Sequence, residues 1–188
     1  MLIEIKDDRN EVIFSYDCEN NTIKKTVEQA VLCDVDLANA ELESADLSGA
    51  NLKNAKLAYA NLANANLENA NCYKADFEEA VFEVANLKHT NLKHANLNFV
   101  MCDNADFSNA MLNYAKINHA SLHDANLKNA NLTKARLVDT DLIGANLQNA
   151  NLSFANLKET MLGNADLTGA NLYCADMKFA CIKGTIGI

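Results

Sequence analysis

The chain of 188 residues contains no proline and no tryptophan, and aromatic residues make up only 6% of it. Hydrophobic residues still account for 49%, so the sequence predicts a thin core built from aliphatic side chains. No apolar run approaches the roughly 18 residues that a membrane-spanning helix needs. Residues 1–8 also lack the basic and then apolar layout of a signal peptide. We therefore expect a cytoplasmic protein without a membrane segment.

Recognisable catalytic motifs are missing as well. The four histidines show no metal-ligand spacing such as H-E-x-x-H, and no nucleophile motif or glycine-rich phosphate loop occurs. The six cysteines include no C-x-x-C pair, which favours free thiols in a reducing compartment. The sequence predicts a protein that is not an enzyme, with no catalytic residue, cofactor site or metal site.

An uninterrupted tandem repeat fills most of the chain. From Val35 to Gly184, thirty five-residue units follow one another without a break in register. The central residue is Leu or a near substitute, from Leu37 to Ile182, and Ala stands two positions before it in twenty-five of the thirty units. The residue between them is usually Asn or Asp. Such a fixed short period is typical of a solenoid.

The period of five excludes long regular elements. In an α-helix five residues advance about 500°, so the Leu side chains would scatter around the helix. In a continuous strand Leu37 and Leu42 would point to opposite faces, because side chains alternate. Within one unit, however, Ala40 and Leu42 share a face in extended chain. We therefore predict a short extended segment followed by a turn in every unit, with Ala and Leu pointing inward.

The last residue of each unit indicates how many units form one coil. Asn and Gly tolerate positive φ and mark turns that require it. When these corner residues are sorted at intervals of twenty, two of the four columns are rich in Gly and Asn, and the other two carry bulky or charged residues. Sorting at intervals of fifteen separates nothing. The sequence therefore favours four units per coil and about seven and a half coils, roughly 36 Å long at about 4.8 Å per coil.

The Ala-Asn/Asp-Leu-x-x unit resembles the pentapeptide-repeat family over about 150 of the 188 residues. The resemblance implies an all-β solenoid, a right-handed quadrilateral β-helix with four units per coil. It also implies two function classes. Many members have no assigned activity, whereas others resemble duplex DNA in shape and negative charge, bind DNA gyrase and protect it from quinolones.

The two ends of the repeat differ. Residues 1–34 do not repeat, and we expect them to form an N-terminal cap: a hairpin from Leu2–Ile5 and Val12–Tyr16, then a short α-helix after Asn20-Asn21-Thr22. The β-helix covers residues 35–184, and residues 185–188 form a C-terminal tail. No capping helix follows, so either the tail folds back over the last coil or two molecules pair there. We predict an end-to-end homodimer, and its candidate contact residues are Ile182, Ile186 and Ile188.

Residue size varies inside the predicted core. Phe77 and Phe82 follow Cys72, while Cys102 lies one coil after Phe82 in the same column and Phe107 follows it. Small Cys side chains beside large Phe side chains conserve volume, as close packing requires. We interpret both cysteines as small buried hydrophobic residues and not as redox groups.

The outward columns predict the candidate partner surface. A near-neutral face lies between the two bulky corners, and the next face is acidic with scattered apolar residues. Exposed aromatic and apolar side chains in a patch are typical of a protein-binding surface; the plainer interpretation is that the corner rings only brace one another by stacking. The candidate residues are Tyr59, Phe99, Tyr114, Phe154, Phe179, Glu41, Glu43, Glu83, Asp103, Asp141, Met101 and Met161.

Charge decides between the two function classes. Duplex DNA carries one negative charge per roughly 1.7 Å, or about twenty over about 36 Å. The whole chain has a formal net charge of −9, of which the repeat holds only part. We therefore predict a non-enzymatic scaffold that binds an unidentified protein, with a gyrase-binding DNA mimic as the alternative. Direct nucleic-acid binding is not expected, because the sequence predicts no continuous basic stripe. A purely structural role without a specific partner stays open.

Overall fold

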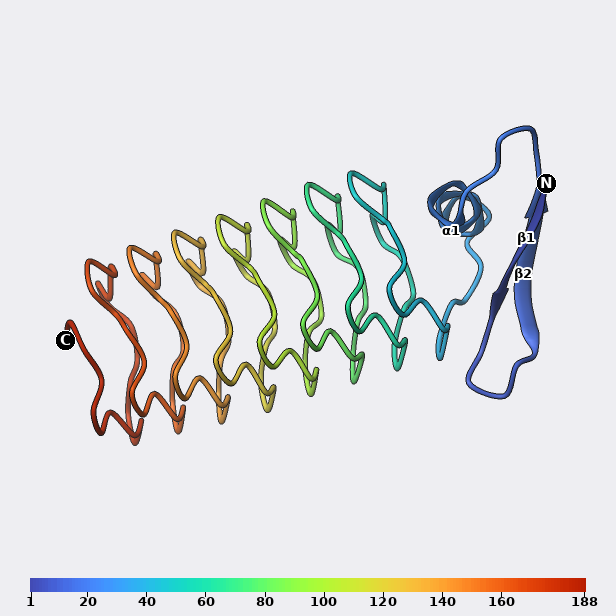
Figure 1. Cartoon of the computed structure of the whole chain (residues 1–188). Helices are drawn as coiled ribbons and strands as arrows, with labels where there is room; N and C mark the ends of the chain where they lie inside the picture. The colour runs from blue at the N-terminus through green and yellow to red at the C-terminus, as the bar shows by residue number, and fades with distance from the viewer.

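The computed structural model describes all 188 residues and shows a rod with one covered end (Figure 1). Strands β1 (Leu2–Lys6) and β2 (Val12–Asp17) pair antiparallel, and helix α1 (Ile23–Leu32) follows them. The rest of the chain winds into successive coils that lead away from α1 to the C-terminus (Figure 1). The predicted hairpin and helix are therefore both present.

Parallel β-bridges join residues that are twenty apart in the sequence. One bridge joins Asp36 to Lys56, and the same spacing continues on all four sides until Asp166 pairs with Ile186. Backbone N–H groups donate to the neighbouring coil, as Leu57 N does to Asp76 O at 2.8 Å. A coil of twenty residues holds four five-residue units, which confirms the prediction of four units per coil.

The corners correct one part of the sequence analysis. All four columns of corner residues have positive φ, including bulky residues such as Tyr59 (φ 62°), Val84 (φ 59°) and Phe99 (φ 61°). The expectation that Gly and Asn mark the corners requiring this conformation was therefore incomplete. In nearly every unit the next Ala N–H donates to the central residue's carbonyl oxygen, as Ala55 N does to Leu52 O at 3.0 Å. This bond and the hydrogen bonds between coils hold the backbone of the corner residues at positive φ. That conformation costs a non-glycine residue about 1–2 kcal/mol.

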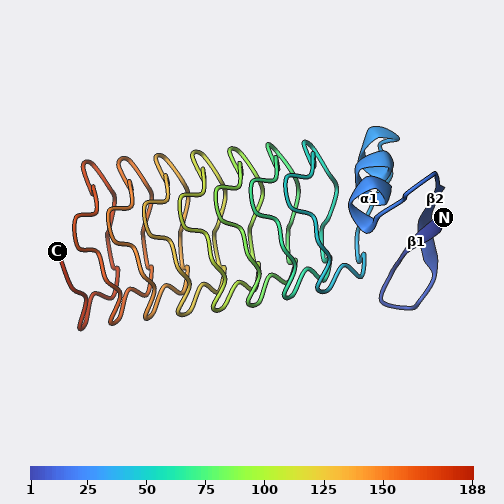
Figure 2. The ribbon, with the colours of Figure 1, turned by 45° about the horizontal axis from the view of Figure 1, so that its top comes forward.

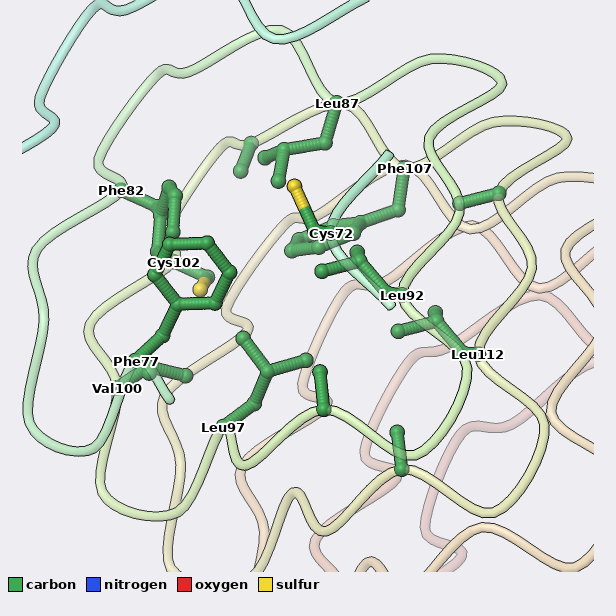
Figure 3. Close-up of a cluster of buried hydrophobic side chains, with 14 of the residues drawn as sticks. Cys72, Phe77, Phe82, Leu87, Leu92, Leu97, Val100, Cys102, Phe107 and Leu112 are labelled. Carbon is green, nitrogen blue, oxygen red and sulfur yellow. The ribbon is translucent and has the colours of Figure 1, made fainter. Parts of the chain in front are cut away.

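The core is a continuous column of 53 buried hydrophobic residues. Phe77 and Phe82 meet edge to face with ring centroids 5.0 Å apart, and the nearby Cys72 and Cys102 are fully buried (Figure 3). Burial raises the pKa of the Cys72 thiol far above its ordinary value. For Cys102 burial acts first, and the negative charge of Asp103 adds to it. The prediction that both cysteines are buried is confirmed.

Threonine replaces Ala at several inward positions without leaving its hydroxyl unpaired. Thr160 Oγ1 donates to Leu137 O at 2.8 Å, in the preceding coil. Thr140 bonds Ile117 O in the same way at 2.7 Å. These buried hydroxyls therefore act as additional links between coils.

The outward Asn and Asp residues have a structural role in the turns and between the coils. Asn86 Oδ1 accepts the backbone N–H of Lys88 at 3.2 Å, so its side chain closes a local turn. Its Nδ2 donates to Asn66 Oδ1 at 3.0 Å in the preceding coil. The amide side chains therefore link neighbouring coils along the rod and also close the local turns.

The N-terminal elements cover the first coil (Figure 2). Thr22 is the N-cap of α1 and accepts the Lys25 N–H. Glu41 N donates to the carbonyl oxygen of Lys6 in β1 at 2.8 Å, and Asn51 N donates to Glu28 Oε1 in α1 at 2.8 Å. Side chains from both elements, including Ile5 and Val27, are buried in the core. The N-terminal elements therefore supply the first coil with both hydrogen-bond partners and an apolar cover.

Candidate functional surfaces

The rod presents four outward faces. Each face consists of the two outward side chains and the corner residue of one five-residue unit, together with the residues that follow these at intervals of twenty. Face 1 starts with residues 36, 38 and 39, face 2 with 41, 43 and 44, face 3 with 46, 48 and 49, and face 4 with 51, 53 and 54. Their formal net charges are −2, −5, −2 and +4. The charge of the repeat is therefore segregated by face.

Face 2 holds the acidic and apolar residues of the predicted partner surface. Glu41, Glu43, Glu83, Asp103 and Asp141 lie along it, with Met101 45% exposed and Met161 40% exposed. Asp103 Oδ1 accepts hydrogen bonds from Ser121 Oγ at 2.5 Å and from His123 N at 3.2 Å.

The predicted aromatic residues divide between two corners. Tyr59, Phe99 and Phe179 lie on the corner that face 1 shares with face 2, whereas Tyr114 and Phe154 lie on the corner between face 4 and face 1. The structure therefore brings the first three beside the acidic residues and separates the other two from them by the width of face 1.

Several corner rings contact one another, as the bracing interpretation expects. The Phe99 ring stacks on the His119 ring with centroids 4.9 Å apart, and His119 Nδ1 lies 3.1 Å from Asp139 Oδ2. Phe99 is still 47% exposed. One part of the Phe99 ring surface therefore packs against His119, and another part remains exposed to solvent.

Face 4 has a character that the sequence analysis missed. It carries Lys53, Lys74, Lys93 and Lys134 and no carboxylate. Tyr73 and Tyr114 lie among these lysines. The signal was present in the sequence, because assigning charges and corner residues together to the twenty-residue columns separates face 4 from the other three.

The C-terminal end of the rod remains open. Ile182, Ile186 and Ile188 are 50%, 58% and 64% exposed. Ile186 continues the ladder beside Asp166 and does not fold back over the last coil. Leu172 in the last complete coil and Met177 in the incomplete coil after it are only partly buried. The structure thus disfavours the fold-back alternative for the tail.

Three aspartates of one column on face 3 have lowered pKa values. Hydrogen bonds from the Ser48 side chain and backbone lower the pKa of Asp46, and those from Gln148 and Thr168 lower the pKa of Asp166. Burial tends to raise the pKa of Asp106, but bonds from Ser108 and Lys88 outweigh it. These carboxylates stabilise turns and coil contacts.

The concave and metal-binding features of the chain are few. One hollow of about 350 Å³ lies between β2 and α1, away from the four faces, lined by Tyr16, Cys18, Lys25, Glu28, Gln29 and Leu32. No His, Cys, Asp and Glu side chains gather in a group suited to a metal ion. None of the helices has the length and apolar character required to cross a membrane.

Comparison with known proteins agrees with this geometry. The family model for pentapeptide repeats matches eight copies, over residues 27–54, 45–83, 85–129, 120–153 and 150–186. The chain belongs to the pentapeptide repeat family. No protein with a curated functional description matches it.

Solved structures of the family are similar to the chain. One is HetL, a pentapeptide repeat protein involved in heterocyst differentiation regulation in the cyanobacterium Nostoc sp. strain PCC 7120. Its sequence is 28% identical to this chain, the match covers 87% of this chain and 96% of HetL, and the TM-score is 0.42. Another Nostoc pentapeptide repeat protein is 30% identical over 50% of this chain and 84% of its own, with a TM-score of 0.43. QnrB1, a plasmid-mediated fluoroquinolone resistance protein, is 17% identical over 77% of this chain and 78% of its own, with a TM-score of 0.39.

Proposed function

We propose that the chain is a non-enzymatic scaffold that presents a rigid surface to a protein partner. The proposal places it in the cytoplasm, and it includes the right-handed coil that family membership implies. The observation that carries this proposal is the side of the rod formed by face 2 and the corner beside it. There Phe99 and Met101 remain nearly half exposed next to the acidic residues. Exposed apolar and aromatic side chains with a polar surround are typical of protein interfaces.

Quantitative affinity capture from the native host tests this proposal. The bait is the whole chain, compared with the variant Phe99→Ser/Met101→Ser/Met161→Ser. The matched control, Met111→Ser/Tyr114→Ser/Phe154→Ser, removes three apolar side chains from face 4. We expect one protein to be lost with the first variant and retained with the control. Retention with both variants, or enrichment of nothing by the unmodified chain, would contradict the proposal.

We also propose that two molecules pair end to end through the open last coil. Partly exposed Leu172, Met177 and Ile182 supply an apolar surface there, and the unpaired backbone edge supplies hydrogen-bonding groups. Light scattering over rising concentration should show a dimer, and Ile182→Asp should give a monomer. A strict monomer at high concentration would refute the pairing.

The alternative function is that of a DNA mimic that binds DNA gyrase. The observation in its favour is the segregation of charge, since the acidic residues occupy three contiguous faces of a rod. Two features oppose it: the charge density is well below that of duplex DNA, and face 4 is basic. A gyrase supercoiling assay with and without a quinolone tests it. Inhibition or protection at submicromolar protein would establish the mimic, and no effect at tens of micromolar would remove it.

A further inference from the structure

Face 4 is the basic side of an acidic protein, and its lysines have no acidic partners. Elsewhere on the repeat, three of the eight Lys and Arg side chains, Lys56, Lys88 and Lys158, lie within 2.8–3.3 Å of Asp carboxylate oxygens. No carboxylate lies within 4.0 Å of Lys53, Lys74, Lys93 or Lys134. The four positive charges of face 4 are thus not neutralised within the chain.

Aromatic rings hold most of these lysines in place. Lys53 Nζ and Lys74 Nζ lie 5.9 and 5.5 Å from the centroid of the Tyr73 ring. Lys134 Nζ lies 5.4 Å from the Tyr114 centroid and 5.9 Å from the Phe154 centroid. These are cation–π distances. A lysine already restrained in this way loses less side-chain freedom when a ligand binds, so the face is preorganised for an anion.

The spacing of the lysines indicates the size of the ligand. Lys53 lies in the first coil and Lys134 in the fifth, so they are about 19 Å apart along the rod at about 4.8 Å per coil. In an extended polypeptide, side chains on one side recur every roughly 6.8 Å. About four carboxylates on one side of an extended segment, separated by three such intervals, would therefore span the four lysines.

The rings of face 4 favour a protein ligand over a nucleic acid. The His94 and Tyr114 rings are parallel with centroids 4.9 Å apart, and Lys134 lies over Tyr114 and Phe154. Because His94 and Lys134 lie against the Tyr114 ring, this ring offers a base little surface for stacking. The other three faces are net negative and would repel a long phosphate backbone more than a short acidic segment.

From these observations we propose that face 4 is a docking surface for an acidic polypeptide segment of a partner protein, in extended conformation. This surface is distinct from face 2. The failure of one proposal therefore leaves the other standing.

Fluorescence anisotropy with a labelled twelve-residue peptide of alternating Glu and Thr, at low salt, tests the docking surface. The whole chain is compared with Lys53→Gln/Lys74→Gln/Lys93→Gln/Lys134→Gln. The matched control is Lys88→Gln/Lys116→Gln/Lys128→Gln/Lys158→Gln, which removes four charges from faces 1 and 3. We expect the face 4 variant to bind about tenfold more weakly and the control to change less than about twofold.

The substitution Tyr73→Leu tests the role of the rings, because it keeps every lysine. We expect the peptide affinity to fall about two- to threefold through loss of the cation–π contacts. Equal loss in the control and face 4 variants, or no binding by the unmodified chain, would overturn the proposal. Tighter binding of a twelve-nucleotide single-stranded DNA, lost with the face 4 variant, would assign the face to nucleic acid and overturn it too. Unchanged circular dichroism verifies that each variant folds.

Discussion

The two ends of the rod are built from the same repeat but are finished differently. At the N-terminal end, β1 accepts the Glu41 N–H, α1 accepts the Asn51 N–H, and Ile5, Val27 and Ala30 complete the core. At the C-terminal end the backbone N–H groups of Leu172 and Met177 have no backbone acceptor. The chain thus closes one end itself and leaves the other for a partner or for solvent.

This difference teaches which interactions a solenoid coil needs. Each coil depends on its two neighbours for hydrogen bonds and for apolar contact. A cap at one end replaces one neighbour, and the coil next to it can be as well packed as a central one. A terminal coil without a cap keeps only one neighbour and should be the first part of the rod to open.

The largest expected effect compares matched leucines in one column. Leu52 in the first coil is fully buried, whereas Leu172 in the last complete coil is only partly buried. Leu52→Ala should lower the free energy of unfolding by about 2–5 kcal/mol, because it leaves a cavity in a packed site. Leu172→Ala should cost about 1 kcal/mol or less. Urea denaturation of both variants measures the difference, and equal costs would show that the two ends are equally packed.

Inward threonines, one buried and one partly exposed at the open end, give a second matched pair. Leu137 O accepts no backbone bond within its own turn and relies on Thr160 Oγ1, whereas Leu162 O accepts Thr185 Oγ1 and also the Ala165 N–H. Thr160→Val should therefore cost about 1–3 kcal/mol, since it leaves a buried carbonyl oxygen unpaired.

Thr185→Val should cost about 0.5 kcal/mol, because its carbonyl acceptor keeps a partner. Valine preserves the shape of both side chains, so thermal unfolding of the two variants isolates the hydroxyl contribution. A larger loss for Thr185→Val than for Thr160→Val would contradict the assignment.

A smaller effect concerns the link between α1 and the first coil. Glu28→Ala removes the acceptor of the Asn51 N–H. The site is exposed and water can replace the carboxylate, so we expect a loss of about 0.5–1.5 kcal/mol. Hydrogen exchange at the Asn51 amide should accelerate. The control Glu159→Ala alters a carboxylate on face 1 and should leave that amide unchanged; equal acceleration in both would refute the link.

The smallest expected effect is a change in the pH dependence of stability in acid. Because the pKa values of Asp46 and Asp166 lie below the ordinary 3.8, their contribution to stability is complete above that pH. It is lost as the pH falls through the lower folded-state values. Asp46→Asn and Asp166→Asn introduce the residue that other coils use in this column, as Asn66 and Asn146 do.

Melting temperatures between pH 5 and pH 2 should therefore fall less steeply for each variant than for the unmodified chain. The change should be smaller for Asp166→Asn, because the open last coil contributes less to the cooperative unit. An unchanged pH dependence in both variants would show that these carboxylates do not stabilise the fold.

Much of the architecture could be predicted from the sequence, because the repeat restricts the chain so strongly. The inward Leu and Ala positions, the four units per coil and the buried Cys72 beside Phe77 all follow from side-chain direction and period. The hairpin and α1 follow from local patterns. The positive φ of residues such as Val84 could not be predicted in this way, since hydrogen bonds between coils impose it against the preference of the residue.

The surfaces were harder to predict. The twenty-residue columns predict the candidate residues of face 2, but Tyr114 and Phe154 lie on a different corner from Phe99. The lysines of face 4 were assigned no role, because their lack of partners and their contacts with Tyr73 and Tyr114 depend on side-chain conformation. Whether the tail covered the last coil also depended on tertiary structure, which the composition of residues 185–188 does not determine.

Hydrogen exchange on the monomer tests the contrast between the two ends most directly. At low protein concentration, the amides of Leu172, Met177 and Ile182 should exchange rapidly. The amides of Leu152, Leu157 and Leu162 lie one coil earlier in the same columns and donate to backbone oxygens at 2.8 Å. These amides should be protected from exchange, as should the amide of Leu52 beside the cap. Equal protection of both sets in the monomer would contradict an open C-terminal end.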